Sequence, residues 1–485
     1  MRLNWDNLLT TETLSGRKRK VHPVDGRTPF DKDYYKIVFS APFRRLQDKA
    51  QLFPLDSSDF VRTRLTHSIE VSSVARTLGI CLCQKIKDNH CEDWHEDYSN
   101  SIPRILECAG LVHDLGNPPL GHAGESYIQQ EISRVIENNP ICKAIDYKSN
   151  SYSQYVSDFL AYEGNSQTFR ILTHLQCMND FYGLHLTAAL LATVMKYPVS
   201  STVGNKQKDP DIRLHKCGYF LAEEDEAMAV AKKTGLLQDG FIRRHPLTYL
   251  LEAADDIAYT TGDIEDGMKK HLFSIHELKL FFEEFNSSIG EDDNAAPLND
   301  DKIQHIVDYM TELERDKSYL TNEKRIQAFR NRMHKLLIPA VIDAFDENYE
   351  SIMTGSFNKE LLLNSQVKNL RKCLKEFAKK RLINDKEIVA KEITGKKVLS
   401  NLISFFEEGL LRIVDGSINF DERIASLISE EYLKIFLNKV QATDYRNIPL
   451  TKVNIYYILL LITDQISGMT DSHCMTLYRK INGFY

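Results

Sequence analysis

A chain of 485 residues exceeds the usual size of one small hydrophobic core, which predicts two or three domains or one large helical body with insertions. Its hydrophobic content of 42% and charged content of 27% are ordinary for a globular protein. The formal net charge of -7 excludes a molecule that binds polyanions over its whole surface, so any phosphate binding must come from local clusters.

Three features predict a cytoplasmic protein without a membrane anchor. The nine cysteines include no CxxC motif and fit reduced thiols better than a disulfide framework. The start, MRLNWDNLLT, lacks the basic-then-apolar order of a signal peptide. The most apolar run, Ile455 to Ile462, is too short to span a bilayer.

The first half of the chain reads as a series of helices. Residues 1–50 are mixed and basic, and SGRKRK indicates either a solvated arm or a contact with phosphate or another subunit. Apolar residues at helical spacing predict helices from Leu65 to Ile86, over residues 104–116, and from Gly121 through Ile136. His67 lies near the start of the first of these helices, with Arg64 on the adjoining part of the same face.

Helical patterns continue beyond a polar connector at residues 138–158. They resume in EGNSQTFRILTHL and in GLHLTAALLATVMKYP, and a surface loop is expected at residues 200–213. Residues 246–268 form a strong helix candidate. An acidic loop at 287–300 precedes long charged helices as far as residue 384, with an interruption expected near Pro339. Strand patterns are scarce, so the fold class is all-α, mainly helical.

The stretch LVHDLGNPPLGHAGE, residues 111–125, gathers chemically active side chains around a helix break. His113 and Asp114 precede the Gly-Asn-Pro-Pro break, which can direct both side chains inward. His122 and Glu125 follow at i,i+3 spacing, which favours an imidazole and a carboxylate side by side on one helix. A chance His-Asp pair in a helical core is the alternative interpretation.

A metal site is predicted from four positions along the chain. The candidate ligands are His67, His113, Asp114 and one of the pair Asp255 and Asp256. Two imidazoles and two carboxylates leave coordination positions open for water or a phosphate oxygen. Such ligands suit a divalent metal ion, which could be Mg, Mn, Co, Ni, Fe or Zn, and the ligand set by itself does not choose among these metals.

Longer strings of the sequence resemble the HD-domain phosphohydrolases, and specifically the bacterial deoxyguanosine triphosphate triphosphohydrolase (dGTPase) family. The strings that carry the resemblance are FRRLQDKAQLFPL, VRTRLTHSIEV, HDLGNPPLGHAGE, EGNSQTFRILT, KYP, EAADDIAY and the late SGMTD. They extend from Phe43 to Asp471 and so cover nearly the whole chain.

The resemblance implies three regions: an N-terminal arm and first helix at 1–50, an HD-domain core with the metal and catalytic residues at 51–270, and C-terminal helices at 271–485. The last region would complete the nucleotide pocket and provide oligomer contacts. The implied reaction is hydrolysis of dGTP to deoxyguanosine and inorganic triphosphate by attack of water at the α-phosphorus.

The family pattern also implies roles for individual residues. The metal ligands would be His67, His113, Asp114 and Asp255, the last chosen because it follows Ala254 in the family's AD signature. His122 would transfer a proton, with Glu125 orienting it. The implied substrate contacts are Arg64, Lys196 and Lys216 for phosphate, Tyr197, Tyr259 and Asp263 for deoxyribose, and Gln51 and Glu392 for the sugar or guanine edge.

Other functions remain as alternatives at this stage. One is a dNTP triphosphohydrolase of broad specificity with the same chemistry, and another is an HD phosphodiesterase or nucleotidase. A third is a non-catalytic nucleotide or nucleic-acid sensor that uses basic segments near Arg17 and Lys379. The resemblance further implies a homo-oligomer, for example a hexamer, and single-stranded DNA or a second dNTP as an effector.

Overall fold

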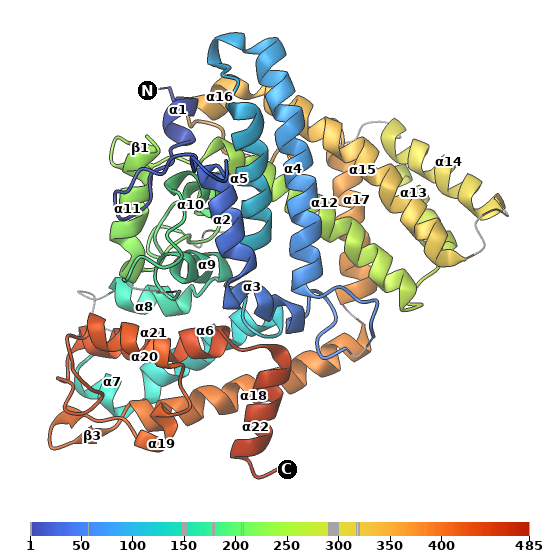
Figure 1. The fold of residues 1–485 in the computed structure, drawn as a ribbon. Coiled ribbons are helices and arrows are strands. Elements are labelled where there is room, and N and C mark those ends of the chain that lie inside the picture. The colour runs from blue at the N-terminus through green and yellow to red at the C-terminus, as the bar shows by residue number, and fades with distance from the viewer. Residues whose placement is uncertain are drawn as a thin grey trace.

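The computed structural model describes residues 2–484 except 57, 148–152, 177–179, 205, 207, 290–299, 317, 319–320 and 384; for His122, Ser153 and Ile383 it describes the backbone alone. In this part of the chain the protein is mainly α-helical, which confirms the predicted class (Figure 1). The strands form two short antiparallel hairpins: β1 (Leu237–Gln238) with β2 (Phe241–Ile242), and β3 (Ile413–Val414) with β4 (Ser417–Ile418).

The helices follow one another in the order shown by the colours of Figure 1. Those before β1 are α1 (Trp5–Leu8), α2 (Pro29–Val38), α3 (Ala41–Arg45), α4 (Arg64–Asn89), α5 (Tyr98–Val112), α6 (Gly121–Asn138), α7 (Pro140–Ala144), α8 (Ser153–Leu160), α9 (Gly164–Thr173), α10 (Ala188–Val194) and α11 (Glu224–Lys233). Those after β2 are α12 (Pro246–Lys269), α13 (Ile275–Ser288), α14 (Asp301–Arg315), α15 (Asn322–Glu347), α16 (Tyr349–Met353), α17 (Lys368–Ala378), α18 (Lys386–Leu410), α19 (Glu422–Ala425), α20 (Glu430–Lys439), α21 (Lys452–Ser467) and α22 (Asp471–Ile481).

The centre of the molecule is the antiparallel pair α4 and α5, which α12 crosses. Two glycines allow the pair to approach closely: a Cβ added at Gly79 would lie 2.8 Å from Cα of Pro103, and one at Gly110 would lie 2.5 Å from Cα of Ser72. Apolar residues such as Val71, Leu78 and Leu106 are fully buried between these helices. This packing brings the start of α4 next to the end of α5.

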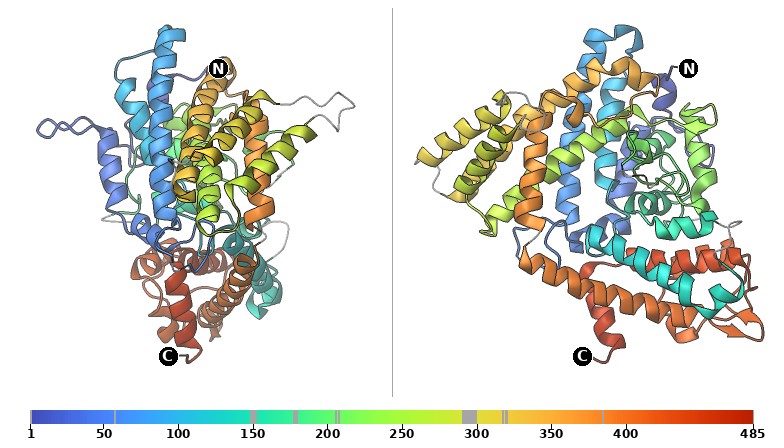
Figure 2. Two further views of the ribbon diagram at one scale, coloured as in Figure 1. Left: turned by 90° about the vertical axis from the view of Figure 1, so that its right-hand side faces the viewer. Right: turned by 180° about the vertical axis from the view of Figure 1, so that it is seen from behind.

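A second group of helices lies across the lower end of this central body. Figure 1 and the right-hand view of Figure 2 show α6, α18 and α21 running across the molecule below α4 and α5, with α22 extending away from them. Helix α18 packs against α6, α21 and α22. Residues from the last hundred positions of the chain therefore lie next to the loop that follows α5.

The N-terminal region is anchored at one end and exposed in its middle. The Trp5 indole Nε1 donates a 2.9 Å hydrogen bond to the Tyr349 hydroxyl of α16. The basic segment 15–27 is exposed except for Arg19, which is half-buried, and Figure 2 shows it as a dark-blue loop that projects from the body. The division of the chain at residues 50 and 270 stays a prediction.

Several predicted boundaries differ from the structure. The predicted interruption near Pro339 is wrong, because α15 continues through it. Pro339 faces solvent, so the helix loses one backbone hydrogen bond there while its opposite face stays packed against α12 and α4. Helix α5 begins earlier than expected and ends at Val112, and α10 begins only at Ala188, because Thr187 caps it through a bond to the Leu190 amide.

The remaining expectations concern loops and membrane segments. The polar connector at 138–158 contains the short helices α7 and α8, with residues 148–152 outside the described residues. Most of the acidic loop at 287–300 also lies outside them. Among the helices that are described, none is long and apolar enough to cross a membrane.

Candidate functional site

The predicted metal ligands come from three packed helices. His67 lies in the first turn of α4, which starts at a capping box formed by Thr63 and Thr66. His113 and Asp114 follow the last residue of α5, and Asp255 lies in α12. Because α4 and α5 are antiparallel and α12 crosses both, these three points of the chain meet.

The four side chains form a compact group. Oδ1 of Asp255 lies 3.2 Å from Nε2 of His67 and 3.4 Å from Nε2 of His113. Oδ1 of Asp114 lies 3.5 Å from Nε2 of His113. In the described part of the chain, the candidate ligand atoms of His67, His113 and Asp114 all lie within 4.8 Å of one another, a spacing that could hold a metal ion.

The hydrogen bonding of His113 fits such an ion. Its Nδ1 lies 2.8 Å from the Gly110 carbonyl oxygen. Because a carbonyl oxygen can only accept, Nδ1 must carry the proton in this bond, which leaves Nε2 of the neutral ring with a lone pair. Nε2 is buried and makes no hydrogen bond, although carboxylate oxygens lie near it. Burial opposes protonation, but the carboxylates of Asp114 and Asp255 outweigh it and raise the pKa of His113. Positive charge is therefore favourable at this point.

Each carboxylate of the group also contacts a basic side chain through its other oxygen. Lys196 Nζ lies 2.9 Å from Oδ2 of Asp255, and the Arg64 guanidinium contacts Oδ2 of Asp114. Gly121, with φ +60°, passes so close to Arg64 that an added Cβ would lie 2.6 Å from its NH2. The sequence after the helix break therefore makes room for this arginine.

A cavity of about 440 Å³ opens beside this group. Its lining includes most of the residues predicted to contact substrate: Gln51, Arg64, Lys196, Tyr197, Lys216, Tyr259 and Glu392. Lys196 is almost fully buried, whereas Tyr197 and Tyr259 are half-buried. Burial raises the pKa of both tyrosines, so their hydroxyls stay protonated at neutral pH.

Three residues predicted for the site are not among the described residues that line the cavity: Asp263, Glu125 and His122. Asp263 is buried one turn along α12 from Tyr259. Glu125 is buried, and its Oε1 accepts a 2.9 Å hydrogen bond from the Gly164 amide. His122 is the second residue of α6, and its side chain lies outside the described residues.

Several residues that were not predicted to contact substrate also line the cavity. Asn117, Asn165, Asp256 and Lys375 all contribute to its wall. The asparagines stand inside the matched strings HDLGNPP and EGNSQ, which was the available signal. Lys375 stands on α17 among many charged residues, and no pattern separates it from solvated lysines. It contacts Asp256 at 2.8 Å.

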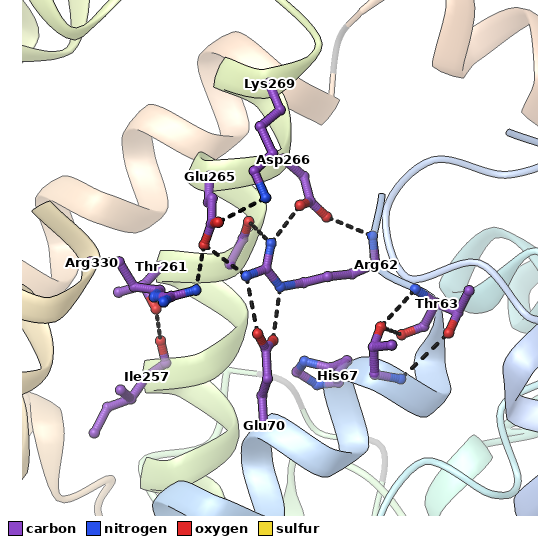
Figure 3. Close-up of polar contacts among 12 residues, drawn as sticks. Arg62, Thr63, His67, Glu70, Ile257, Thr261, Glu265, Asp266, Lys269 and Arg330 are labelled. Atoms are coloured by element: carbon purple, nitrogen blue, oxygen red, sulfur yellow. Dashed lines mark hydrogen bonds and ion pairs between the residues drawn. The ribbon is translucent and has the colours of Figure 1, made fainter. Parts of the chain in front are cut away.

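The start of α4 is fixed to α12 by a buried ion-pair network. Figure 3 shows the Arg62 guanidinium between Glu70 of α4 and the carboxylates of Glu265 and Asp266 on α12. The Arg62 amide also donates to Asp266 at 2.9 Å. Arg330 of α15 contacts Glu265 at 2.7 Å from the other side. Arg62 thus joins the helix of His67 to the helix of Asp255.

The chain is similar over nearly its whole length to several known proteins. A deoxyguanosinetriphosphate triphosphohydrolase-like protein of Listeria monocytogenes is 37% identical, over 99% of this chain and 100% of the relative. A like-named protein of Synechocystis sp. is 31% identical, with 99% of both chains covered. The deoxyguanosinetriphosphate triphosphohydrolase of Enterobacter sp. is 27% identical, over 99% of this chain and 98% of the relative.

No family model matches the chain. The relatives nevertheless cover it from end to end, and the first two exceed 30% identity. The resemblance seen in the sequence strings is therefore confirmed, and the chain belongs to the deoxyguanosinetriphosphate triphosphohydrolase family.

Proposed function

We propose that this protein hydrolyses dGTP to deoxyguanosine and inorganic triphosphate in a metal-dependent reaction. The observation that carries the proposal is the group of His67, His113, Asp114 and Asp255 beside a cavity that is also lined by Arg64, Lys196 and Lys216. A metal centre next to several cations suits a substrate with a polyphosphate chain. The names of the relatives indicate the same class of reaction.

The four residues of the group would hold a divalent cation. Bound there, such an ion supplies positive charge for a phosphoryl oxygen and lowers the pKa of water. Arg64 would contact the phosphates with its planar guanidinium, and Lys196 and Lys216 would act as point charges. Together these residues would fix the α-phosphorus near the start of α6.

Proton transfer would fall to His122, with Glu125 as its orienting partner. Leu120 and Ala123, which flank His122, both line the cavity, so the start of α6 borders the substrate space. Glu125 lies one turn further along α6 and is itself fixed by the Gly164 amide. An imidazole held in one tautomer by a carboxylate can take a proton from water or give one to the leaving 5′ oxygen.

Selection of deoxyribose would depend on the tyrosines of the cavity. A ring of Tyr197 or Tyr259 placed against the 2′ carbon leaves no space for a ribose hydroxyl, which would reject GTP. Asp263 would act through Tyr259, because its carboxylate is near enough to raise the pKa of the Tyr259 hydroxyl. Gln51 and Glu392, which also line the cavity, would contact the sugar or the guanine edge.

Product analysis tests this proposal. Purified protein is incubated with each of the four dNTPs and with GTP, with Mn or Mg added, and the products are separated by ion-exchange chromatography. Intact triphosphate and deoxyguanosine from dGTP alone are expected. A His113→Ala variant serves as the control against contaminating phosphatases and should release none.

Other outcomes would change the proposal. Triphosphate from all four dNTPs would replace dGTP selectivity with broad dNTP specificity. The absence of triphosphate, also with single-stranded DNA or mixed dNTPs as activators, would overturn it in favour of a nucleotide or nucleic-acid sensor.

The expected homo-oligomer, for example a hexamer, is tested by light scattering of the purified protein with and without single-stranded DNA or mixed dNTPs.

A further inference from the structure

The late string SGMTD has no role in the reaction proposed above, yet its last residue reaches the cavity wall. Asp471 is the first residue of α22 and is 5% exposed. Its Oδ2 accepts a 3.0 Å hydrogen bond from the Ala50 amide, and its Oδ1 accepts one of 3.1 Å from the Leu120 amide. One carboxylate near the end of the chain thus holds two backbone segments that line the cavity.

Lys49 donates hydrogen bonds to backbone carbonyl oxygens of the same region. Its side chain is buried, and Nζ donates 2.7 Å hydrogen bonds to the carbonyl oxygens of Asn117 and Ser467. Lys49 and Asp471 therefore join the same three segments: 49–50, 117–120 and 467–471. All four bonded partners are backbone groups, which would otherwise be buried without partners at considerable cost.

The turn that these bonds hold is strained and lies directly before α6. Leu120 has φ +67°, in the left-handed region that costs a residue with a side chain about 1–2 kcal/mol. It is the N-cap residue of α6, and its own side chain makes no capping hydrogen bond. The bond from its amide to Asp471 helps to keep this conformation, and Gly121 and His122 follow immediately.

We propose that Lys49 and Asp471 are positioning residues that set the start of α6, and with it His122, relative to the metal-binding group. This inference rests on the proposed function for His122. It assigns a role in the reaction to the C-terminal helices: α22 contributes a carboxylate that shapes the cavity without contacting substrate. A merely structural pair would stabilise the fold and leave turnover of the folded enzyme unchanged.

The test is the substitution Asp471→Asn. In asparagine an NH2 group takes the place of one carboxylate oxygen, so one of the two backbone N–H groups faces a donor instead of an acceptor. The expected result is a fall in kcat of about 10- to 100-fold, the range typical of groups that orient reacting residues. KM and metal content should not change. The matched control is Asp421→Asn: Asp421 also accepts from two amides at a helix start, those of Arg423 and Ile424, but caps α19 outside the cavity.

A double-mutant cycle separates positioning from general damage. If Asp471 acts through His122, Asp471→Asn should cause no further loss of kcat in a His122→Ala background. Losses that multiply in the double variant, or an unchanged kcat in Asp471→Asn, would overturn the inference. Lys49→Met should reproduce the effect of Asp471→Asn on kcat.

Hydrogen exchange gives a measurement that needs neither a variant nor substrate. In the unmodified protein, the peptide that contains the Leu120 amide should be protected as strongly as the interior of α6. Exchange as fast as in the exposed segment 15–27 would overturn the inference even if no variant folds. Failure of the proposed function is recognised separately, because it would abolish triphosphate release in the unmodified protein and leave this protection in place.

Discussion

At the scale of single residues, two adjacent aspartates of α12 have different environments. Asp255 lies within 3.4 Å of both candidate histidine ligands. Asp256 instead accepts from Arg371 and Lys375, each at 2.8 Å, on the side of α17. Neighbouring positions on a helix point about 100° apart, so only one of the two can face His67 and His113.

We therefore expect the two substitutions to the corresponding amide to differ. Loss of a residue that only orients a metal ligand weakens metal binding by about 10- to 100-fold. Asp255→Asn should weaken Mn binding by more than this, because it removes a ligand. Asp256→Asn, the matched control, should keep full metal stoichiometry. Titration calorimetry with Mn measures both; the reverse pattern would transfer the ligand role to Asp256.

The second prediction at this scale concerns His122. Its replacement by alanine should leave metal binding intact and reduce kcat by about 100- to 10,000-fold, which is the usual contribution of a positioned acid or base. Ser126→Ala, an exposed position on the same helix, is the control and should keep full activity. Full turnover in His122→Ala would show that another group transfers the proton.

At the scale of elements, the site depends on how α4, α5 and α12 are held together. Glycines set the approach of α4 to α5, and Arg62 connects the start of α4 to Glu265 and Asp266 of α12. The Arg62 side chain is 8% exposed and those of Glu265 and Asp266 are 2% exposed, so these three charges are shielded from water. Removing one member of such a network leaves buried charges without compensation.

Arg62→Met should accordingly lower the free energy of unfolding by about 3–5 kcal/mol. Arg76→Met, on α4, is the control: the Arg76 side chain is 51% exposed and lies 3.6 Å from Glu107, so a loss of about 1 kcal/mol or less is expected. Urea denaturation followed by circular dichroism measures both. Equal stability of the two variants would mean that the Arg62 network contributes no net stability.

At the scale of the whole molecule, buried acids connect distant segments. Asp158 of α8 accepts hydrogen bonds from Ser201 at 2.5 Å, from the Leu221 amide at 2.8 Å and from Tyr456 of α21 at 2.7 Å. Burial raises the pKa of Asp158 from 3.8 to about 6, although these hydrogen bonds oppose the rise. Folding therefore favours the protonated acid at this position.

This shift predicts a pH dependence of stability with a definite sign. Between about pH 4 and pH 6 the folded chain keeps a proton at Asp158 that the unfolded chain has released, so the stability due to this group falls as pH rises. The measurement is the free energy of unfolding of the unmodified protein minus that of Asp158→Asn. This difference should fall by up to about 3 kcal/mol as pH rises across this range. A difference that does not vary with pH would contradict the prediction.

Much of the architecture and of the site could be predicted from the sequence, because the signals are local. Helical periodicity identified α4, α6 and α12, and the Gly-Asn-Pro-Pro break placed His113 and Asp114 at a helix end. The errors were local as well. Pro339 was expected to interrupt a helix, but packing of the opposite face outweighs one lost hydrogen bond.

By itself the sequence determined a mainly helical protein of the triphosphohydrolase family with an H, HD, D set of candidate ligands, since composition, periodicity and matched strings need no knowledge of packing. Only the tertiary structure decided that Asp255 faces both histidines while Asp256 faces α17, that Asp263 is buried and does not line the cavity, and that Lys375 does. It also decided that Asp471 holds the turn at Leu120, 351 residues away. The physical reason is that these relations depend on which helices pack together and which way each side chain points, and no local pattern of residues encodes either.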